Sequence, residues 1–160
     1  MREGFYKACL MAPMKLTGSM QWSGVDLDRL WGMIEQNAEV LIRCVPDTSN
    51  IKRLSPNEYS FDIMVHVGPV HGTFNAYVKI NSIDKANGRV SMVLNSKGPG
   101  TSLTANVNAK IMQSGVEYDA DVNISGILAL IGERMIRNYI EGKLRDFMNN
   151  LTKLAKTGQC

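Results

Sequence analysis

Regular alternation of apolar and polar residues through the middle of the chain is the feature that most constrains its fold. Between residues 58 and 125, five stretches separated by the turn sequences GPVHG, KANG, KGPG and QSG carry apolar side chains at every second position. A period of two predicts β-strands, and such short turns join antiparallel neighbours. The shared parity predicts a sheet with one dry and one wet face. The dry face is expected to carry Phe61, Ile63, Val65, Phe74, Ala76, Val78, Met92, Leu94, Leu103, Ala105, Val107, Tyr118 and Val122.

Other periodicities flank these strands. Residues 14–23 alternate as one more strand, and residues 26–36 have the apolar spacing of a helix. A second short helix is expected over residues 38–45, stopped by a proline. Apolar residues then recur every three or four positions from about 126 to 156, which predicts one long helix with Ser125 as its N-cap. One strand, two short helices, about six antiparallel strands and a long helix indicate an α+β fold, in which the helix covers a curved sheet.

The length and charge of the chain limit its domain organisation and its binding partners. A chain of 160 residues is most simply one domain, here 14–156, with an N-terminal extension over 1–13 and a tail over 157–160. No apolar run is long enough for a transmembrane helix. The net charge of +3 does not suggest nucleic-acid binding, and all of it arises after residue 124, where six Lys/Arg outnumber three Asp/Glu. This segment is either a solvated helix whose basic residues suit its C-terminal dipole, or a face for anionic lipid or an acidic partner.

The cysteines and histidines give little sign of chemistry. Cys9, Cys44 and Cys160 are odd in number and scattered, so we expect neither a disulfide framework nor a zinc site. That pattern favours a reducing, cytoplasmic location. His66 and His71 flank a Gly-Pro turn, and the alternation places both on the wet face. We therefore interpret them as surface hairpin residues rather than metal ligands.

The predicted interior also weighs against an enzyme. Tyr118 is the one titratable group on the dry face, while Asp119 and Asp121 share the wet face. General acid–base catalysis requires a positioned proton carrier in a cleft. No phosphate loop, nucleophile elbow or dinucleotide fingerprint is present, so no cofactor is expected. On these patterns alone the apolar interior is either a filled core or a lined space, and a filled core is the commoner case.

The stretch GILALIG, residues 126–132, contains five apolar residues in a row. A helix with one buried face should not be apolar all round. Either the hairpin loops cover the excess, or this is a loose helix start that serves as an entrance to the interior. From this segment and the residues that follow it, we expect Leu128, Ile131 and Met135 to line the interior. Contact with a membrane or partner is expected of Ile127, Leu130, Arg134 and Arg137.

Four stretches together resemble the CoxG family of carbon monoxide dehydrogenase subunits. They are MKLTGSMQW (14–22), LIRCVPD (41–47), VGPVHGTF (67–74) and SGILALIGERMI (125–136). The resemblance covers residues 14–156 and implies the helix-grip fold of the START/polyketide-cyclase superfamily. That fold has a seven-stranded antiparallel sheet wrapped around a long C-terminal helix, with a cavity between them. The resemblance therefore favours a lined space over a filled core.

The same resemblance implies a function. The expected role is a non-enzymatic binding protein for a lipophilic molecule, a lipid or a quinone. It would be an accessory factor that recruits a molybdenum-containing carbon monoxide dehydrogenase to the membrane. The expected location is cytoplasmic, with peripheral contact at the inner face of the cytoplasmic membrane. Two alternatives stay open: a cyclase/aromatase-like enzyme on the same fold, and an assembly adaptor whose cavity is incidental.

Overall fold

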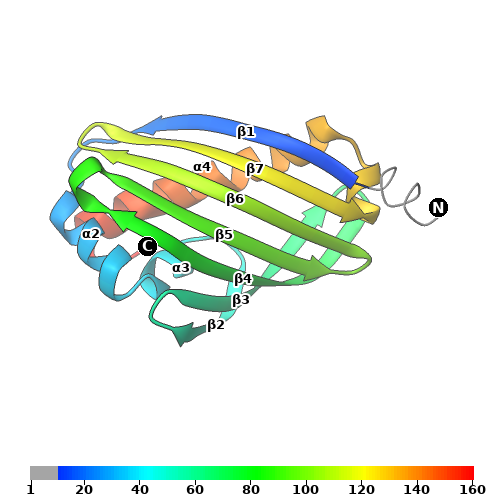
Figure 1. Cartoon of the computed structure of the whole chain (residues 1–160), viewed down its shortest axis with the longest axis horizontal. Helices are drawn as coiled ribbons and strands as arrows, with labels where there is room; N and C mark the ends of the chain where they lie inside the picture. Colours follow the sequence, from blue (N-terminus) through cyan, green and yellow to red (C-terminus); the bar gives the residue numbers. More distant parts are fainter. Residues whose placement is uncertain (1–10) are drawn as a thin grey trace.

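The computed structural model describes residues 11–160 and has two layers, a broad curved sheet and one long helix behind it (Figure 1). The strands are β1 (Met11–Gln21), β2 (Thr48–Ser55), β3 (Glu58–Val67), β4 (Val70–Asp84), β5 (Arg89–Gly98), β6 (Thr101–Met112) and β7 (Gly115–Gly126). The helices are α2 (Leu27–Gln36), α3 (Glu39–Arg43) and α4 (Glu133–Thr157), with 3₁₀ turns η1 (Lys85–Asn87) and η2 (Ile127–Leu130). The predicted α+β helix-grip architecture is confirmed.

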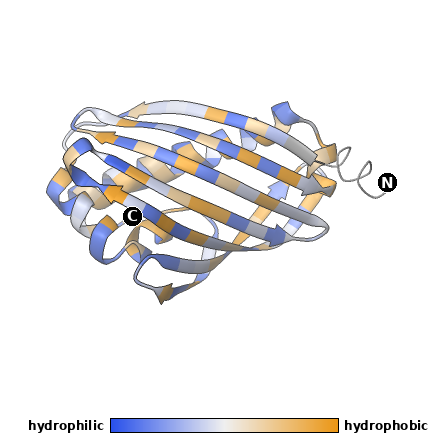
Figure 2. Cartoon of the chain, in the orientation of Figure 1, coloured by the Kyte–Doolittle hydropathy of each residue, from blue (hydrophilic) through white to orange (hydrophobic). Residues whose placement is uncertain are grey.

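All seven strands form one antiparallel sheet in the order β1-β7-β6-β5-β4-β3-β2. Hairpins join every pair from β2 to β7, and β1 closes the far edge beside β7. Bands of apolar and polar residues alternate along the strands (Figure 2). β2 is an edge strand without a buried residue, and its pairing with β3 shifts register twice. Those irregularities explain why the alternation revealed five of the six later strands but not this one.

The start of the chain differs slightly from the expected boundary. β1 begins at Met11, inside the range assigned to an N-terminal extension. Residues 1–10, and with them Cys9, lie outside the described part of the chain.

The two short helices form as their sequence predicts. The Asp26 side chain caps α2 by accepting a hydrogen bond from the Arg29 N–H at 3.2 Å. The buried face of α2 carries Leu30, Trp31 and Ile34. α3 follows after two residues, and together the two helices close one end of the sandwich, near the C-terminus (Figure 1).

The long helix does not begin where it was predicted. Residues 127–130 form η2, and α4 starts only at Glu133, so Ser125 is not a helix cap. Two glycines cause the break, because Gly126 and Gly132 adopt φ of 93° and 110°, values that side-chain-bearing residues rarely adopt. At Gly126 a Cβ would also lie 2.0 Å from the Gly100 carbonyl oxygen. The apolar segment is therefore a separate turn set across the end of the sheet.

The core consists of two clusters rather than one. The η2-end cluster contains Met14, Leu16, Val65, Val67, Val70, Phe74, Ala105, Ala120, Val122, Ile124, Leu128 and Ile136. The closed-end cluster contains Leu30, Trp31, Ile34, Ala38, Cys44, Tyr59, Ile80, Val90, Val116, Met148, Leu151 and Leu154. The first half of α4 packs into one cluster and its second half into the other.

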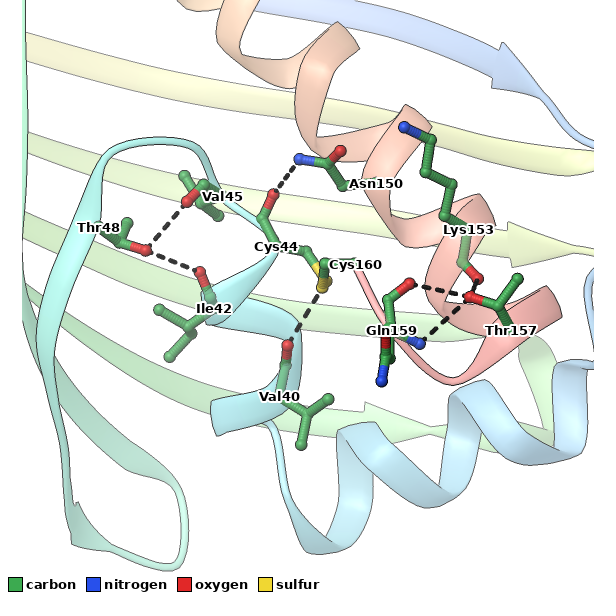
Figure 3. The surroundings of a disulfide bond; sticks show 10 residues. All are labelled: Val40, Ile42, Cys44, Val45, Thr48, Asn150, Lys153, Thr157, Gln159 and Cys160. Carbon is green, nitrogen blue, oxygen red and sulfur yellow. Dashed lines mark hydrogen bonds between the residues drawn. A yellow bond between two sulfur atoms is a disulfide. The ribbon is translucent and has the colours of Figure 1, made fainter.

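A disulfide joins Cys44 to Cys160, with their Cα atoms 5.4 Å apart (Figure 3). The expectation of no disulfide was therefore wrong. The two cysteines are 116 residues apart in sequence, and their approach depends on how α4 returns past α3. Sequence spacing carries no signal of such a contact.

Candidate ligand-binding site

Strand register and burial place the predicted dry-face residues on the side of the sheet that faces α4. Phe61, Val65, Phe74, Ala76, Ala105, Val122 and Leu128 are buried. Ile63, Val78, Met92, Leu94, Leu103, Val107, Tyr118 and Ile131 are half-buried. Met135 differs, because it is 47 % exposed at the start of α4 and does not lie in the interior.

The half-buried residues at the centre of the sheet are the informative ones. Val78 pairs with Leu94, and Met92 pairs with Val107, across the three strands β4, β5 and β6. Central strands facing a helix normally bury such side chains completely. Here they remain partly accessible between the two core clusters, so α4 covers the middle of the sheet incompletely. This middle zone is the candidate site for an apolar molecule.

Tyr118 supplies a polar group at the edge of this zone. It pairs with Gly18 of β1, and a Cβ on Gly18 would lie 2.4 Å from the Tyr118 hydroxyl. The tyrosine ring therefore lies across Gly18, on the side of α4. Burial raises the pKa of Tyr118, and the negative charge of Glu141 on α4 raises it further. The hydroxyl thus stays protonated and able to donate a hydrogen bond.

A charged group on α4 escaped the sequence reasoning. Lys143 has a side chain only 19 % exposed, and its ammonium pairs with Asp47 and lies 5.7 Å from the centre of the Tyr139 ring. Asp47 lies in the turn before β2 and adopts φ of 65°. Lys143 lies four residues after Tyr139 and four before Phe147, so helical spacing on that face could have revealed it.

An exposed apolar patch marks the opposite end from α2 and α3. We call Ile127, Leu130 and Met135 the η2 patch; they are 50 %, 66 % and 47 % exposed. Close approaches at Gly100 and Gly68 place this patch against the turns of the β5–β6 and β3–β4 hairpins. Hairpin loops therefore cover only part of the apolar segment.

The two arginines expected to contact a membrane or partner differ from each other. Arg134 is exposed beside the η2 patch. Arg137 is half-buried, pairs with Glu133 at 3.1 Å and donates to the Lys15 carbonyl oxygen of β1 at 3.1 Å. Arg137 therefore joins α4 to the sheet edge, which leaves Arg134 as the basic residue available to a partner.

Two open hollows lie on the outer face of the sheet, not between the sheet and α4. The larger, about 850 Å³, runs between rows of outward polar side chains on β1, β7, β6, β5 and β4. Two pairs of its polar groups are hydrogen-bonded to each other: Asn108 donates to Asp119 at 3.1 Å, and the Ser82 and Ser91 hydroxyls are 2.6 Å apart.

The histidines lie on the outer face as predicted. His66 and His71 pair across the β3–β4 hairpin, both exposed, with ring centres 4.9 Å apart. Within residues 11–160 no three His, Cys, Asp or Glu side chains come together as a metal site would require. None of the helices in this range is long and apolar enough to cross a membrane.

A seven-stranded antiparallel sheet around a long C-terminal helix, with two short helices after the first strand, defines the START-like helix-grip class. The sequence shows to which family within this fold class the chain belongs. Residues 24–155 match the model of the CoxG family of carbon monoxide dehydrogenase subunits, and the chain belongs to this family. A comparison with curated proteins found no match.

Solved structures share the fold at low sequence identity. A conserved protein from Geobacillus kaustophilus is 16 % identical, with a TM-score of 0.76 over 92 % of this chain and 98 % of that one. Major latex-like protein 151 from Panax ginseng is 9 % identical, with a TM-score of 0.53 over 88 % and 97 %. The di-domain ARO/CYC BexL of the BE-7585A biosynthetic pathway is 10 % identical, with a TM-score of 0.59 over 91 % of this chain and 50 % of BexL.

Proposed function

We propose that this protein binds a lipophilic molecule, a lipid or a quinone, between the sheet and α4. In this proposal it is a non-enzymatic accessory factor of a molybdenum-containing carbon monoxide dehydrogenase. The observation that carries the ligand is the incomplete cover over Val78, Met92, Leu94 and Val107 at the centre of the sheet. Membership of the CoxG family supports the partner.

The chemistry of this zone suits an apolar tail. Its sheet side chains are uncharged, and burial of each CH₂ contributes about 0.8 kcal/mol. The flexible thioether of Met92 can adapt to tails of different shape. Tyr118, at the edge of the zone, can donate a hydrogen bond to an oxygen at the polar end of such a molecule.

Contact with a membrane is the second part of the proposal. The η2 patch presents three apolar side chains beside Arg134. Apolar residues flanked by a basic one suit the interface of an anionic bilayer, where each basic residue contributes about 1 kcal/mol near the surface. This arrangement supports a peripheral position on the cytoplasmic side of the membrane, next to the dehydrogenase.

A displacement assay tests the ligand. A fluorescent apolar probe is bound to the protein and displaced with a short-tailed quinone. Val107→Phe fills the middle zone and should weaken quinone binding by about tenfold, which corresponds to about 1.4 kcal/mol. Asn106→Phe adds the same ring to the outer face of β6 and should leave binding unchanged.

The same assay can refute the proposal. If neither probe nor quinone binds, and native mass spectrometry of protein from its own host shows no lipid, the middle zone is not a ligand site. An adaptor role would then remain. Thermal unfolding of both variants verifies that Val107→Phe is still folded.

One observation favours a second candidate, an enzyme of the cyclase/aromatase type. Tyr118 is a proton donor on the inner face, and BexL shares the fold. An enzyme would convert a bound polyketide-like molecule to a product of changed mass, and Tyr118→Phe would abolish that conversion. A carrier would release its ligand unchanged.

A further inference from the structure

The Cys44–Cys160 bridge joins one buried and one exposed residue. Cys44 follows α3, belongs to the closed-end cluster and is 1 % exposed. Cys160 lies after α4 in an exposed segment that starts at Lys156. A small thiol in solution therefore has a path to the bridge from the Cys160 side.

The turn after α4 positions Cys160 through contacts that do not depend on the bridge. Gly158 adopts φ of 81°, and its N–H donates to the Leu154 carbonyl oxygen at 2.8 Å, which ends the helix. The Thr157 hydroxyl donates to the Lys153 carbonyl oxygen at 2.8 Å and accepts from the Gln159 N–H at 3.3 Å (Figure 3). The chain thus turns back toward α3 and brings the two thiols together.

The α3–β2 turn is also joined to α4 without the bridge. The Asn150 side-chain amide donates to the Cys44 carbonyl oxygen at 2.8 Å, and Lys143 pairs with Asp47. Trp31 and Leu154 surround the same region in the closed-end cluster. None of these contacts involves a sulfur atom of the bridge, so we expect the reduced protein to keep its two layers.

We propose that Cys44 and Cys160 form a reversible thiol–disulfide clasp at the closed end. When the clasp is oxidised, it ties the end of α4 to α3. When it is reduced, no covalent bond holds the last residues to α3, and the α3–β2 turn is joined to α4 by the Asn150 and Lys143 contacts and by packing in the closed-end cluster. Disulfides inside cells are commonly redox-sensing, which agrees with the cytoplasmic location proposed above.

The exchange chemistry needs only a small thiol and its disulfide. An external thiolate attacks the Cys160 sulfur, the bridge breaks, and Cys44 leaves as a thiolate that takes up a proton. A second external thiolate then attacks the small-molecule sulfur of the mixed disulfide. This forms a small disulfide and releases Cys160 as a thiolate, which takes up a proton. In the reverse direction, two protein thiols lose two electrons and two protons to one small disulfide, which becomes two thiols.

Redox titration of the full chain tests the clasp. Cys9→Ser protein, which keeps both bridging cysteines, is equilibrated in glutathione buffers from fully reduced to fully oxidised and then alkylated. Intact mass should show two alkylated thiols on the reduced side and none on the oxidised side, with a midpoint inside the buffer range. Cys9→Ser/Cys160→Ser protein should show one alkylatable thiol throughout.

Hydrogen exchange then measures what the clasp does. We expect amides of residues 39–47 and 151–157 to exchange at least about tenfold faster in reduced than in oxidised protein. Strands β5 and β6 should be unchanged, and the Cys160→Ser variant should match the reduced protein in both buffers. A bridge that never forms, one that millimolar glutathione does not reduce, or equal exchange in both states would each overturn the proposal. None of these results depends on ligand binding.

Discussion

The two ends of α4 meet very different surroundings. At the closed end, its last turns pack against α2 and α3, Arg29 donates to the Ala155 carbonyl oxygen at 3.3 Å, and a disulfide follows the helix. At the η2 end, its first turn lies beside a patch of exposed apolar side chains, and Gly132 separates it from η2. One helix thus has an anchored end and an open end.

This difference indicates where the molecule can change without unfolding. Part of a protein can open without global unfolding where few buried contacts hold it closed. Fewer contacts join α4 to the rest of the molecule at the η2 end than at the closed end. An apolar molecule entering the middle zone would therefore pass more easily beside η2 than through the closed end. The closed end supplies the stability that lets the η2 end keep apolar residues at the surface.

Removing the largest anchor at the closed end should have the largest effect. Trp31 is 4 % exposed in the closed-end cluster, and Trp31→Ala should lower the free energy of unfolding by about 3–5 kcal/mol. Leu130→Ala at the η2 end should change it by less than about 0.5 kcal/mol. Urea unfolding followed by circular dichroism measures both. Similar losses at the two ends would contradict the comparison.

The disulfide should contribute next. It closes a loop of 116 residues, so Cys160→Ser should lower the free energy of unfolding by about 2–4 kcal/mol in oxidising buffer. In reducing buffer, wild type and variant should unfold together, because neither then has a bridge. Urea titrations at both redox conditions give the four values, and a variant equal to wild type under oxidation would mean that the bridge does not stabilise the fold.

The sequence predicted the sheet well because its signal is local and repeated. Five strands alternate with one shift of register, between β4 and β5. A slip of one residue would expose a whole apolar face, so Phe74 and Val122 could be placed without a structure. β2 lacks that signal, since its bulges break the period and its side chains stay at the surface. The position of β2 is therefore determined by its pairing with β3 rather than by a pattern in its own sequence.

The candidate site was predicted less completely, because it depends on contacts distant in sequence. Lys143 was missed because it is not one of the apolar positions whose spacing predicts the helix. The separation of η2 from α4 at Gly132 was also not predicted. Glycine inside a helix is only mildly destabilising, but the positive φ of Gly132 prevents η2 and α4 from forming one continuous helix. The approach of Cys160 to Cys44 follows from the tertiary fold alone.

A substitution in the η2 patch should weaken membrane binding but hardly change stability. Leu130→Asp should change the free energy of unfolding by less than about 0.5 kcal/mol while removing most binding to anionic liposomes in flotation. Leu54→Asp is the matched control, because Leu54 is an exposed leucine outside the η2 patch: it is 54 % exposed and lies on β2. The neighbouring Arg53 donates a hydrogen bond to the Gln36 carbonyl oxygen, which places this part of β2 beside α2. Equal losses for both leucines would indicate nonspecific adsorption, and no loss for Leu130→Asp would exclude this patch from membrane contact.

The smallest expected effect comes from Asp62, on the outer face and outside both core clusters. Side-chain amides of Asn50 and Asn75 donate to its carboxylate at 2.8 and 3.2 Å, and these hydrogen bonds lower the pKa of Asp62. A folded pKa below the unfolded one means that the carboxylate stabilises the fold above about pH 4 and loses this contribution as the pH falls through the lowered value.

Asp62→Asn should therefore be slightly less stable than wild type at pH 7, and this gap in the free energy of unfolding should close toward pH 3. Because β2 is bound to β3 partly through Asn50, the loss should appear as faster amide exchange in β2, with no change in α2 or α4. Urea midpoints at the two pH values, together with exchange in β2, measure this. A gap of the same size at pH 7 and pH 3 would mean that the substitution acts through packing rather than through the carboxylate charge.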